Sequence, residues 1–317
     1  MVPFQEWTDE SVDEMRGHVS EAEHFWAAYC GARFMALSLP LTQRERIRKH
    51  RAAVALSQCL GMDARTAAYH ARRCLLYRRE AVLHEIFALN LAPSFLLRIV
   101  EAMEVAGADR IKAGRGEGLL MISLHYSLYS SLLVFWLARA TACGLFRNLA
   151  VLVLSTPTGS VSPSQQRLAL LQQGGIWSAE TRLIDRRIMG SPWSARRLIS
   201  YIKMGGAVLI LPDATFVSTT NSRAVTLKLG KECVAVPRGA AWLVQQTDVP
   251  LISVHVHPYE DRHAIVFDSS KDPDAGKDSI GRVRDALQHL IEQTVLVDPG
   301  PWEGWLREGF TEAISHN

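Results

Sequence analysis

Three ionisable residues that directly follow predicted strands could carry out acid–base chemistry. His125 comes after the apolar run 119–124, Asp213 after 207–211, and Arg238 after a short strand at 234–236. In α/β proteins, ligands bind outside the carboxyl ends of the strands. A histidine and a carboxylate at that edge would supply a general base and its partner, and an arginine would attract a substrate with negative or developing negative charge.

Each of these residues also has a purely structural interpretation. His125 could be a core histidine whose ring is satisfied, and the apolar stretch 118–137 that contains it could span a membrane. Asp213 could be a turn residue after Pro212, and Arg238 a surface charge at the start of a helix. His255 and His257 alternate on a predicted strand, but no third residue is spaced to complete a metal site with them.

The elements that would position these residues follow from hydrophobic periodicity and from turn residues. Residues 9–92 are predicted to be helical, and Gly61 is placed to end a helix. Beyond residue 96, short strands alternate with helices, which predicts an α/β fold with a mixed, partly parallel sheet covered by helices. We expect one domain, 1–317, with a helical N-terminal region 1–95 and an α/β core 96–317. The predicted strands are 96–105, 119–124, 148–154, 207–211, 234–236, 251–256 and 263–268. The predicted helices are 128–142, 164–173, 192–204 and 280–297, and the predicted loops are 156–164 and 216–232.

Composition excludes several classes of protein. The chain is 48% hydrophobic and has a net charge of +3, which is too small to indicate a nucleic-acid partner. Its five cysteines are scattered and form no CxxC pair, so a zinc site and a disulfide framework are not predicted. The acidic N-terminus lacks the apolar segment of a signal peptide. These features indicate a cytoplasmic location. The arginines of 72–79 have two interpretations, a solvated helix face or a surface for an acidic carrier protein or anionic lipid, and a further basic cluster lies at 44–51.

Four segments, taken in order, resemble the bacterial lipid A biosynthesis lauroyl/myristoyl acyltransferases of the lysophospholipid acyltransferase superfamily. The similar segments, which extend over about residues 70–310, are GEGLLMISLHYS (116–127), LISYIKMGGAVLILPDA (198–214), TLKLGKECVAVPRGAAWLVQQTDVPLISVHV (226–256) and DPGPWEGWL (298–306). The resemblance implies a lysophospholipid acyltransferase-like fold. It also implies transfer of an acyl group from an acyl carrier protein or coenzyme A thioester to a hydroxyl or amine, without a cofactor or metal.

The resemblance implies roles for individual residues and exposes one departure. His125 stands where the family has its general base, whereas the family's acidic residue, five positions later, is replaced by Ser130. A serine can accept a hydrogen bond from the imidazole but supplies no charge. Asp213 is the candidate to replace the missing acid, so the expected catalytic residues are His125, Ser130 and Asp213. Arg238, Lys228 and Tyr126 are expected to bind substrate.

The missing acid leaves three functional interpretations open. The chain could be an acyltransferase acting on a small-molecule or carrier-bound acceptor, in natural product biosynthesis rather than on lipid A, since the membrane anchor of its lipid A relatives is lacking. It could instead be a thioester hydrolase on the same scaffold, or a non-catalytic protein that binds acyl carriers or lipids. None of the three requires a transmembrane segment, although peripheral contact with a membrane is compatible with each.

Overall fold

The N-terminal third of the protein is a group of helices. The computed structural model describes residues 22–90, 102–112, 118–153, 181–185, 192–221, 224–259, 262–269, 278–307 and 310–314. Helix α2 (Ala22–Ser38) is followed by α3 (Gln43–Leu60) and α4 (Ala64–Asn90). Helix α3 begins at a capping box, in which the side chains of Thr42 and Glu45 each bond the other's backbone N–H, and it ends at Gly61 with φ 67°. The predicted helix end at Gly61 is therefore confirmed.

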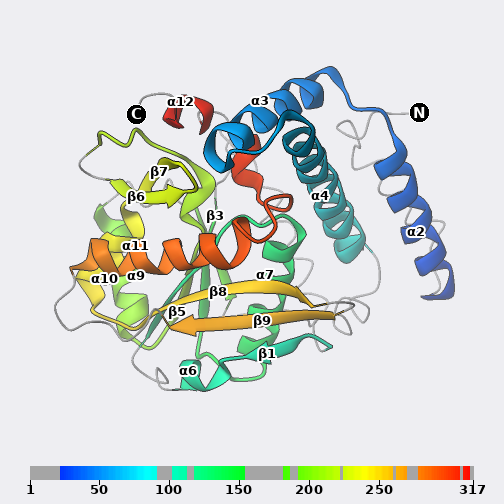
Figure 1. Ribbon diagram of the computed structural model, residues 1–317. Coiled ribbons are helices and arrows are strands. Elements are labelled where there is room, and N and C mark those ends of the chain that lie inside the picture. Colours follow the sequence, from blue (N-terminus) through cyan, green and yellow to red (C-terminus); the bar gives the residue numbers. More distant parts are fainter. Residues whose placement is uncertain are drawn as a thin grey trace.

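A seven-stranded sheet forms the centre of the remaining chain (Figure 1). The strand order is β1-β9-β8-β2-β5-β3-β4, and among the described pairs of this sheet only β8 and β9 run antiparallel. The strands are β1 (Glu104–Ala106), β2 (Leu119–Ile122), β3 (Leu149–Val153), β4 (Thr181–Asp185), β5 (Ala207–Ile210), β8 (Leu251–Tyr259) and β9 (Arg262–Ser269). The predicted α/β class with a mixed, partly parallel sheet is confirmed, and the sheet is mostly parallel.

Every residue of β2 and of β5 is buried, because helices cover both faces of these central strands. Helix α7 contacts β3 and β8, whereas α11 contacts β8 and the neighbouring hairpin. The remaining elements are α6 (Ala108–Lys112), α7 (Leu128–Ala142), α9 (Pro192–Lys203), the 3₁₀ turn η3 (Pro212–Ala214), α10 (Gly239–Thr247), α11 (Ser279–Leu290), the π-helical turn η4 (Ile291–Val295), the 3₁₀ turn η5 (Glu303–Leu306) and α12 (Phe310–Ile314).

Several element predictions need correction. The predicted loop 216–232 contains β6 (Ala224–Leu229), which pairs antiparallel with β7 (Glu232–Pro237) in a separate two-stranded hairpin. This loop prediction was wrong because the alternation of buried and exposed residues in AVTLKL is short and is flanked by polar residues. Strand β4 was not predicted. The predicted loop 156–164, the helix 164–173 and the helix start before residue 22 lie outside the described residues.

The helical N-terminal region shares its core with the sheet. Buried residues of α3 and α4, such as Leu56 and Leu75, belong to the same hydrophobic cluster as the residues of β2 and β5. The C-terminal segment, red in Figure 1, lies beside these helices, and η5 contacts both α3 and α4. Arg73 of α4 fixes this segment through two 2.8 Å bonds to the carboxylate of Asp298.

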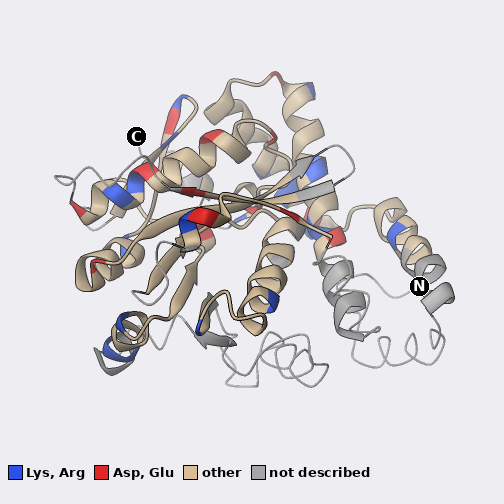
Figure 2. Ribbon diagram, turned by 90° about the horizontal axis from the view of Figure 1, so that it is seen from below, with Lys and Arg blue, Asp and Glu red and all other residues tan. Residues whose placement is uncertain are grey.

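Basic residues of α4 are partly used inside the protein. Arg79 is 4% exposed and bonds both carboxylate oxygens of Glu45, at 2.8 and 2.7 Å, and the carbonyl oxygens of Ala36 and Leu39. It therefore ties α2, α3 and α4 together. Because Arg73 and Arg79 are engaged in ion pairs, the interpretation of 72–79 as one basic docking surface does not hold for them. On the side of the protein that Figure 2 shows, basic and acidic residues are interspersed.

Candidate functional site

The side chains of His125 and Asp213 meet at the carboxyl edge of the sheet. Strands β2 and β5 are parallel neighbours, and their last residues, Ile122 and Ile210, are paired in register. Each of the two ionisable residues lies three positions after the last residue of its strand. The register of the two strands therefore brings both residues to the same height along the sheet edge. The Nδ1 atom of His125 lies 2.8 Å from Oδ1 of Asp213.

Asp213 is a buried carboxylate surrounded by hydrogen-bond donors. Its side chain is 1% exposed. The backbone N–H of His125 donates to both carboxylate oxygens, at 3.1 and 2.9 Å, and the indole N–H of Trp302 donates to Oδ2 at 2.8 Å. Burial alone would raise the pKa of Asp213, but the charge of His125 and these hydrogen bonds outweigh it and keep the pKa below its ordinary value. Asp213 is therefore ionised at neutral pH.

The ring of His125 joins this buried carboxylate to the surface. Its side chain is 28% exposed, whereas that of its partner is almost fully enclosed. An ionised carboxylate only accepts hydrogen bonds, so Nδ1 must carry the proton that lies between the two groups. The lone pair of neutral His125 is then on Nε2, on the opposite side of the ring. This arrangement can accept a proton from a bound molecule.

The C-terminal segment completes the site from a distant part of the sequence. Besides the bond from Trp302 to Asp213, the backbone N–H of Glu303 donates to the carbonyl oxygen of His125 at 2.9 Å. Trp302 is 1% exposed and packs edge-to-face against Trp305, with ring centroids 4.9 Å apart. The sequence analysis singled out DPGPWEGWL (298–306) as a resembling segment but did not assign Trp302 to the site. Its signal was a cluster of aromatic residues in an otherwise polar terminus.

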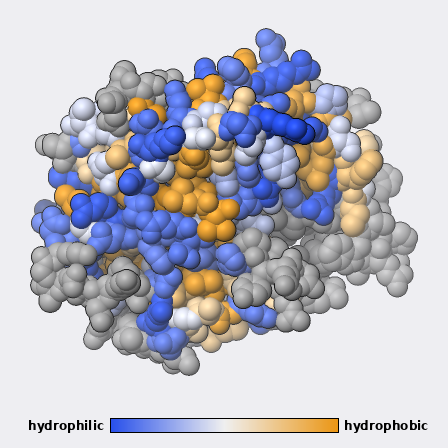
Figure 3. Space-filling model, in the orientation of Figure 1, coloured by the Kyte–Doolittle hydropathy of each residue, from blue (hydrophilic) through white to orange (hydrophobic). Residues whose placement is uncertain are grey.

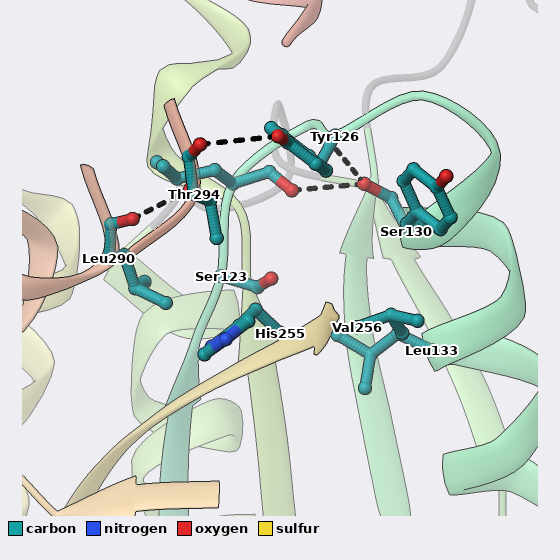
Figure 4. Close-up of a pocket in the computed structure, with 10 residues that line it drawn as sticks. Ser123, Tyr126, Ser130, Leu133, His255, Val256, Leu290 and Thr294 are labelled. Atoms are coloured by element: carbon teal, nitrogen blue, oxygen red, sulfur yellow. Dashed lines mark hydrogen bonds between the residues drawn. The ribbon is translucent and has the colours of Figure 1, made fainter. Parts of the chain in front are cut away.

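Ser130 does not occupy the place of the missing acid. Its hydroxyl donates to the carbonyl oxygen of Leu124 at 2.9 Å and accepts the backbone N–H of Tyr126 at 2.6 Å (Figure 4). These bonds tie together the two residues that flank His125. The expectation that Ser130 accepts a hydrogen bond from the imidazole is wrong, because both of its bonds go to backbone groups and the imidazole Nδ1 is bound by Asp213. Ser130 instead holds the loop that presents His125.

Ser127, in the same loop, has an unusual backbone. Its φ is 45° and its ψ is −128°, in a region that residues other than glycine rarely adopt. Its hydroxyl is buried and has no hydrogen-bond partner. Strain of this kind concentrates at functional sites, where the surrounding structure imposes it. Here it occurs two residues after His125, at the start of α7.

Tyr126 is part of the framework and not of an open surface. It is 6% exposed, and its hydroxyl lies 2.5 Å from the carbonyl oxygen of Asp298 and 3.2 Å from that of Thr294. Burial and the nearby charge of Asp298 raise the pKa of Tyr126. With Ser123, Leu133 and His255, Tyr126 lines a narrow pocket beneath the His125 loop (Figure 4). The expected contact of Tyr126 with substrate stays a prediction, and this pocket is where such a contact would occur.

Arg238 and Lys228 are not brought to the edge of the sheet where His125 lies. Arg238 is exposed at the N-terminus of α10, and the strand before it, β7, belongs to the separate hairpin. The strand-end argument for Arg238 was therefore wrong. Lys228 is exposed on β6, and its backbone N–H and carbonyl bond the side chain of Gln288. Neither side chain has a described contact with His125 or Asp213.

His255 and His257 do not form a metal site. Their rings are 6.3 Å apart, edge to face, and no group of three or more His, Cys, Asp or Glu residues in the described chain is placed to hold a metal ion. His255 is 7% exposed, and burial together with the charge of His257 lowers its pKa from 6.5 to about 4. It is therefore a neutral core histidine at physiological pH.

Comparisons with known proteins add no family assignment. A scan against protein-family models matches no family, and a search of curated proteins finds no match to this chain. Among the described helices, none is long and apolar enough to cross a membrane. The function must therefore be argued from the geometry of the site.

Proposed function

We propose that this protein is an acyltransferase with a lysophospholipid acyltransferase-like fold, in which His125 is the general base and Asp213 is its acidic partner. The observation that carries the proposal is the 2.8 Å contact between His125 Nδ1 and the buried carboxylate of Asp213. The acid that the motif lacks at Ser130 is thus replaced from the adjacent strand.

The arrangement of the resembling segments supports the same function. Three of them, 116–127, 198–214 and 298–306, are far apart in sequence, yet His125, Asp213 and Trp302 from these three segments meet at one point. A chance similarity of separate motifs has no reason to converge in space.

In the proposed reaction, His125 accepts one proton from the acceptor and later gives it to the leaving group. His125 Nε2 takes the proton from the acceptor's hydroxyl or amine as its oxygen or nitrogen attacks the thioester carbonyl carbon. The carbon–sulfur bond then breaks, and the imidazolium returns the proton to the departing thiolate. Asp213 stays ionised throughout, holds Nδ1–H and stabilises the positive ring. The donor would be an acyl carrier protein or coenzyme A thioester, and the acceptor a small or carrier-bound molecule of natural product biosynthesis.

A second histidine–carboxylate pair serves as an internal comparison. His289 Nε2 lies 2.6 Å from Asp268 Oδ2, but Asp268 also pairs with Arg110 and its side chain is 26% exposed. Asp268 lies within β9 and not beyond the carboxyl end of a parallel strand. This pair therefore lacks both the buried acid and the location at the sheet edge.

The test compares His125→Ala with His289→Ala in assays with acyl carrier protein and coenzyme A thioesters. We expect His125→Ala to fold and to lose turnover, and His289→Ala to retain it. Acylated acceptor among the products supports transfer, whereas free acid alone would show hydrolysis on the same scaffold. Turnover that persists in His125→Ala would contradict the proposed base.

A further inference from the structure

Helix α3 and the C-terminal segment form a second concave site, which is lined by arginines. The residues around it are Arg44, Ile47, Arg48, Arg51, Trp305, Leu306 and Arg307. We call it the arginine pocket. It contains about 400 Å³ of space, including its open mouth. Trp305 and Leu306 are 2% and 5% exposed and form an apolar wall, and hydrophilic residues predominate at the upper edge of the molecule where α3 lies (Figures 1 and 3).

The sequence of α3 places three of its four arginines on one face. Arg44, Arg48 and Arg51 are separated by four and three residues, so they lie one above another along the helix. The rotation of α3 is fixed, because Glu45 is held both by the capping box and by the buried Arg79. The three guanidinium groups are therefore directed to the same side of the helix by the fold and not by chance rotation.

The described residues that line the pocket include four arginines. No aspartate or glutamate is among the described residues that line it. Of the nearby acids, Glu45 is engaged with Arg79, and Glu303 is 3.6 Å from Arg307. Like charges three and four residues apart destabilise a helix. An anion bound beside Arg44, Arg48 and Arg51 would offset the repulsion between their charges.

The pocket is directly connected to the His125–Asp213 pair. Trp305 forms its wall and packs on Trp302, whose indole N–H bonds Asp213. Glu303, at the start of the same 3₁₀ turn, donates its backbone N–H to the carbonyl oxygen of His125. A molecule held in the arginine pocket would therefore lie beside Trp305, which belongs to the same C-terminal segment that holds the His125–Asp213 pair.

We propose that the arginine pocket binds a phosphate group. Guanidinium groups present paired N–H donors that match the oxygens of a phosphate, and a dianion offsets more of the cluster's charge than a carboxylate would. The hollow accommodates a small group and is not an extended track. The phosphate could belong to coenzyme A, as its 3′-phosphate, or to a phosphorylated small-molecule acceptor. Phosphate binding itself does not depend on His125 being catalytic.

The first experiment measures binding of inorganic phosphate by isothermal titration calorimetry, with chloride at equal ionic strength as the reference anion. The double variant Arg44→Gln/Arg51→Gln should bind phosphate at least about tenfold more weakly, which is the loss expected when a charge-assisted hydrogen bond is removed. The matched control Lys49→Gln removes one charge from α3 outside the pocket and should stay within about twofold of the wild type. Arg51→Lys keeps the charge but loses the paired donors, so it should also bind more weakly than the wild type.

The second experiment identifies the source of the phosphate. If it comes from coenzyme A, coenzyme A binds tighter than dephospho-coenzyme A, and the double variant abolishes the difference. If it comes from an acceptor, the two bind equally and a small phosphomonoester such as phenyl phosphate competes with inorganic phosphate. Phosphate binding no tighter than chloride, or equal in the wild type and the double variant, would overturn the proposal. Loss of transfer in His125→Ala with phosphate binding retained separates this inference from the proposed function.

Discussion

Replacing Asp213 by asparagine tests the central pair with almost no change in volume. All three groups that contact the carboxylate are donors: the ring of His125, its backbone N–H and the indole of Trp302. An amide has one accepting oxygen and one donating nitrogen. In either orientation, its NH₂ faces a donor. If it faces His125 Nδ1, that nitrogen must lose its proton, and the proton moves to Nε2.

The expected effects follow from this mismatch. A histidine protonated on Nε2 cannot act as the base, and the corresponding substitution in a serine protease triad lowers kcat by ~10⁴-fold. We expect a loss of that order in acyl transfer by Asp213→Asn. A buried donor left without an acceptor costs about 1–3 kcal/mol of unfolding free energy. Urea denaturation and steady-state kinetics measure the two effects separately.

The pH dependence of stability supplies a further check on Asp213. Its pKa is lowered in the folded protein, so its stabilising contribution is complete above the ordinary value of about 3.9 and is lost as the pH falls through the folded value. The stability difference between the wild type and Asp213→Asn should therefore shrink in acid. The matched control Asp268→Asn breaks the other histidine pair and should retain transfer. A folded Asp213→Asn protein within about tenfold of wild-type kcat would refute the assignment.

Three other substitutions probe the surrounding structure. Ser130→Asp should not raise activity and should lower the unfolding free energy by about 1–3 kcal/mol in urea melts, because a carboxylate would face the carbonyl of Leu124; a gain in kcat would contradict the role given to Ser130. Ser127→Gly should raise the unfolding free energy by about 1 kcal/mol, since it relieves positive φ and removes a buried hydroxyl without a partner; a lower melting temperature would argue against strain. The wild type should lose about 2 kcal/mol between pH 7 and pH 5 through His255, which stays neutral when folded but binds a proton when unfolded. His255→Phe should lack that loss, and equal acid sensitivity of the two proteins would rule it out.

Local pattern was sufficient to predict many elements of the fold. The helix predicted at 128–142 is α7 (Leu128–Ala142), and the strands before His125 and Asp213 were found because the apolar runs 119–124 and 207–211 each follow a glycine. Parallel pairing then follows from the alternation of strands and helices. The α/β class and the positions of His125 and Asp213 at strand ends are therefore properties of the sequence.

Predictions failed where a residue's role depends on its long-range partners. Arg238 follows a strand as predicted, but the order of strands places that strand in a separate hairpin. Arg79 has helical spacing typical of a surface residue, yet it is buried because Glu45, 34 positions earlier, meets it. Spacing along one helix cannot reveal which face a distant helix covers.

The sequence by itself thus determined that a histidine and an aspartate end two buried strands. Only the tertiary structure decided that the strands are adjacent and in register, which brings residues 88 positions apart to 2.8 Å. It also decided that Ser130 bonds backbone groups and that Trp302 completes the shell of Asp213. The physical reason is that hydrogen-bond geometry depends on separations of a few ångströms, which are set by the packing of whole elements and are not encoded in any local pattern.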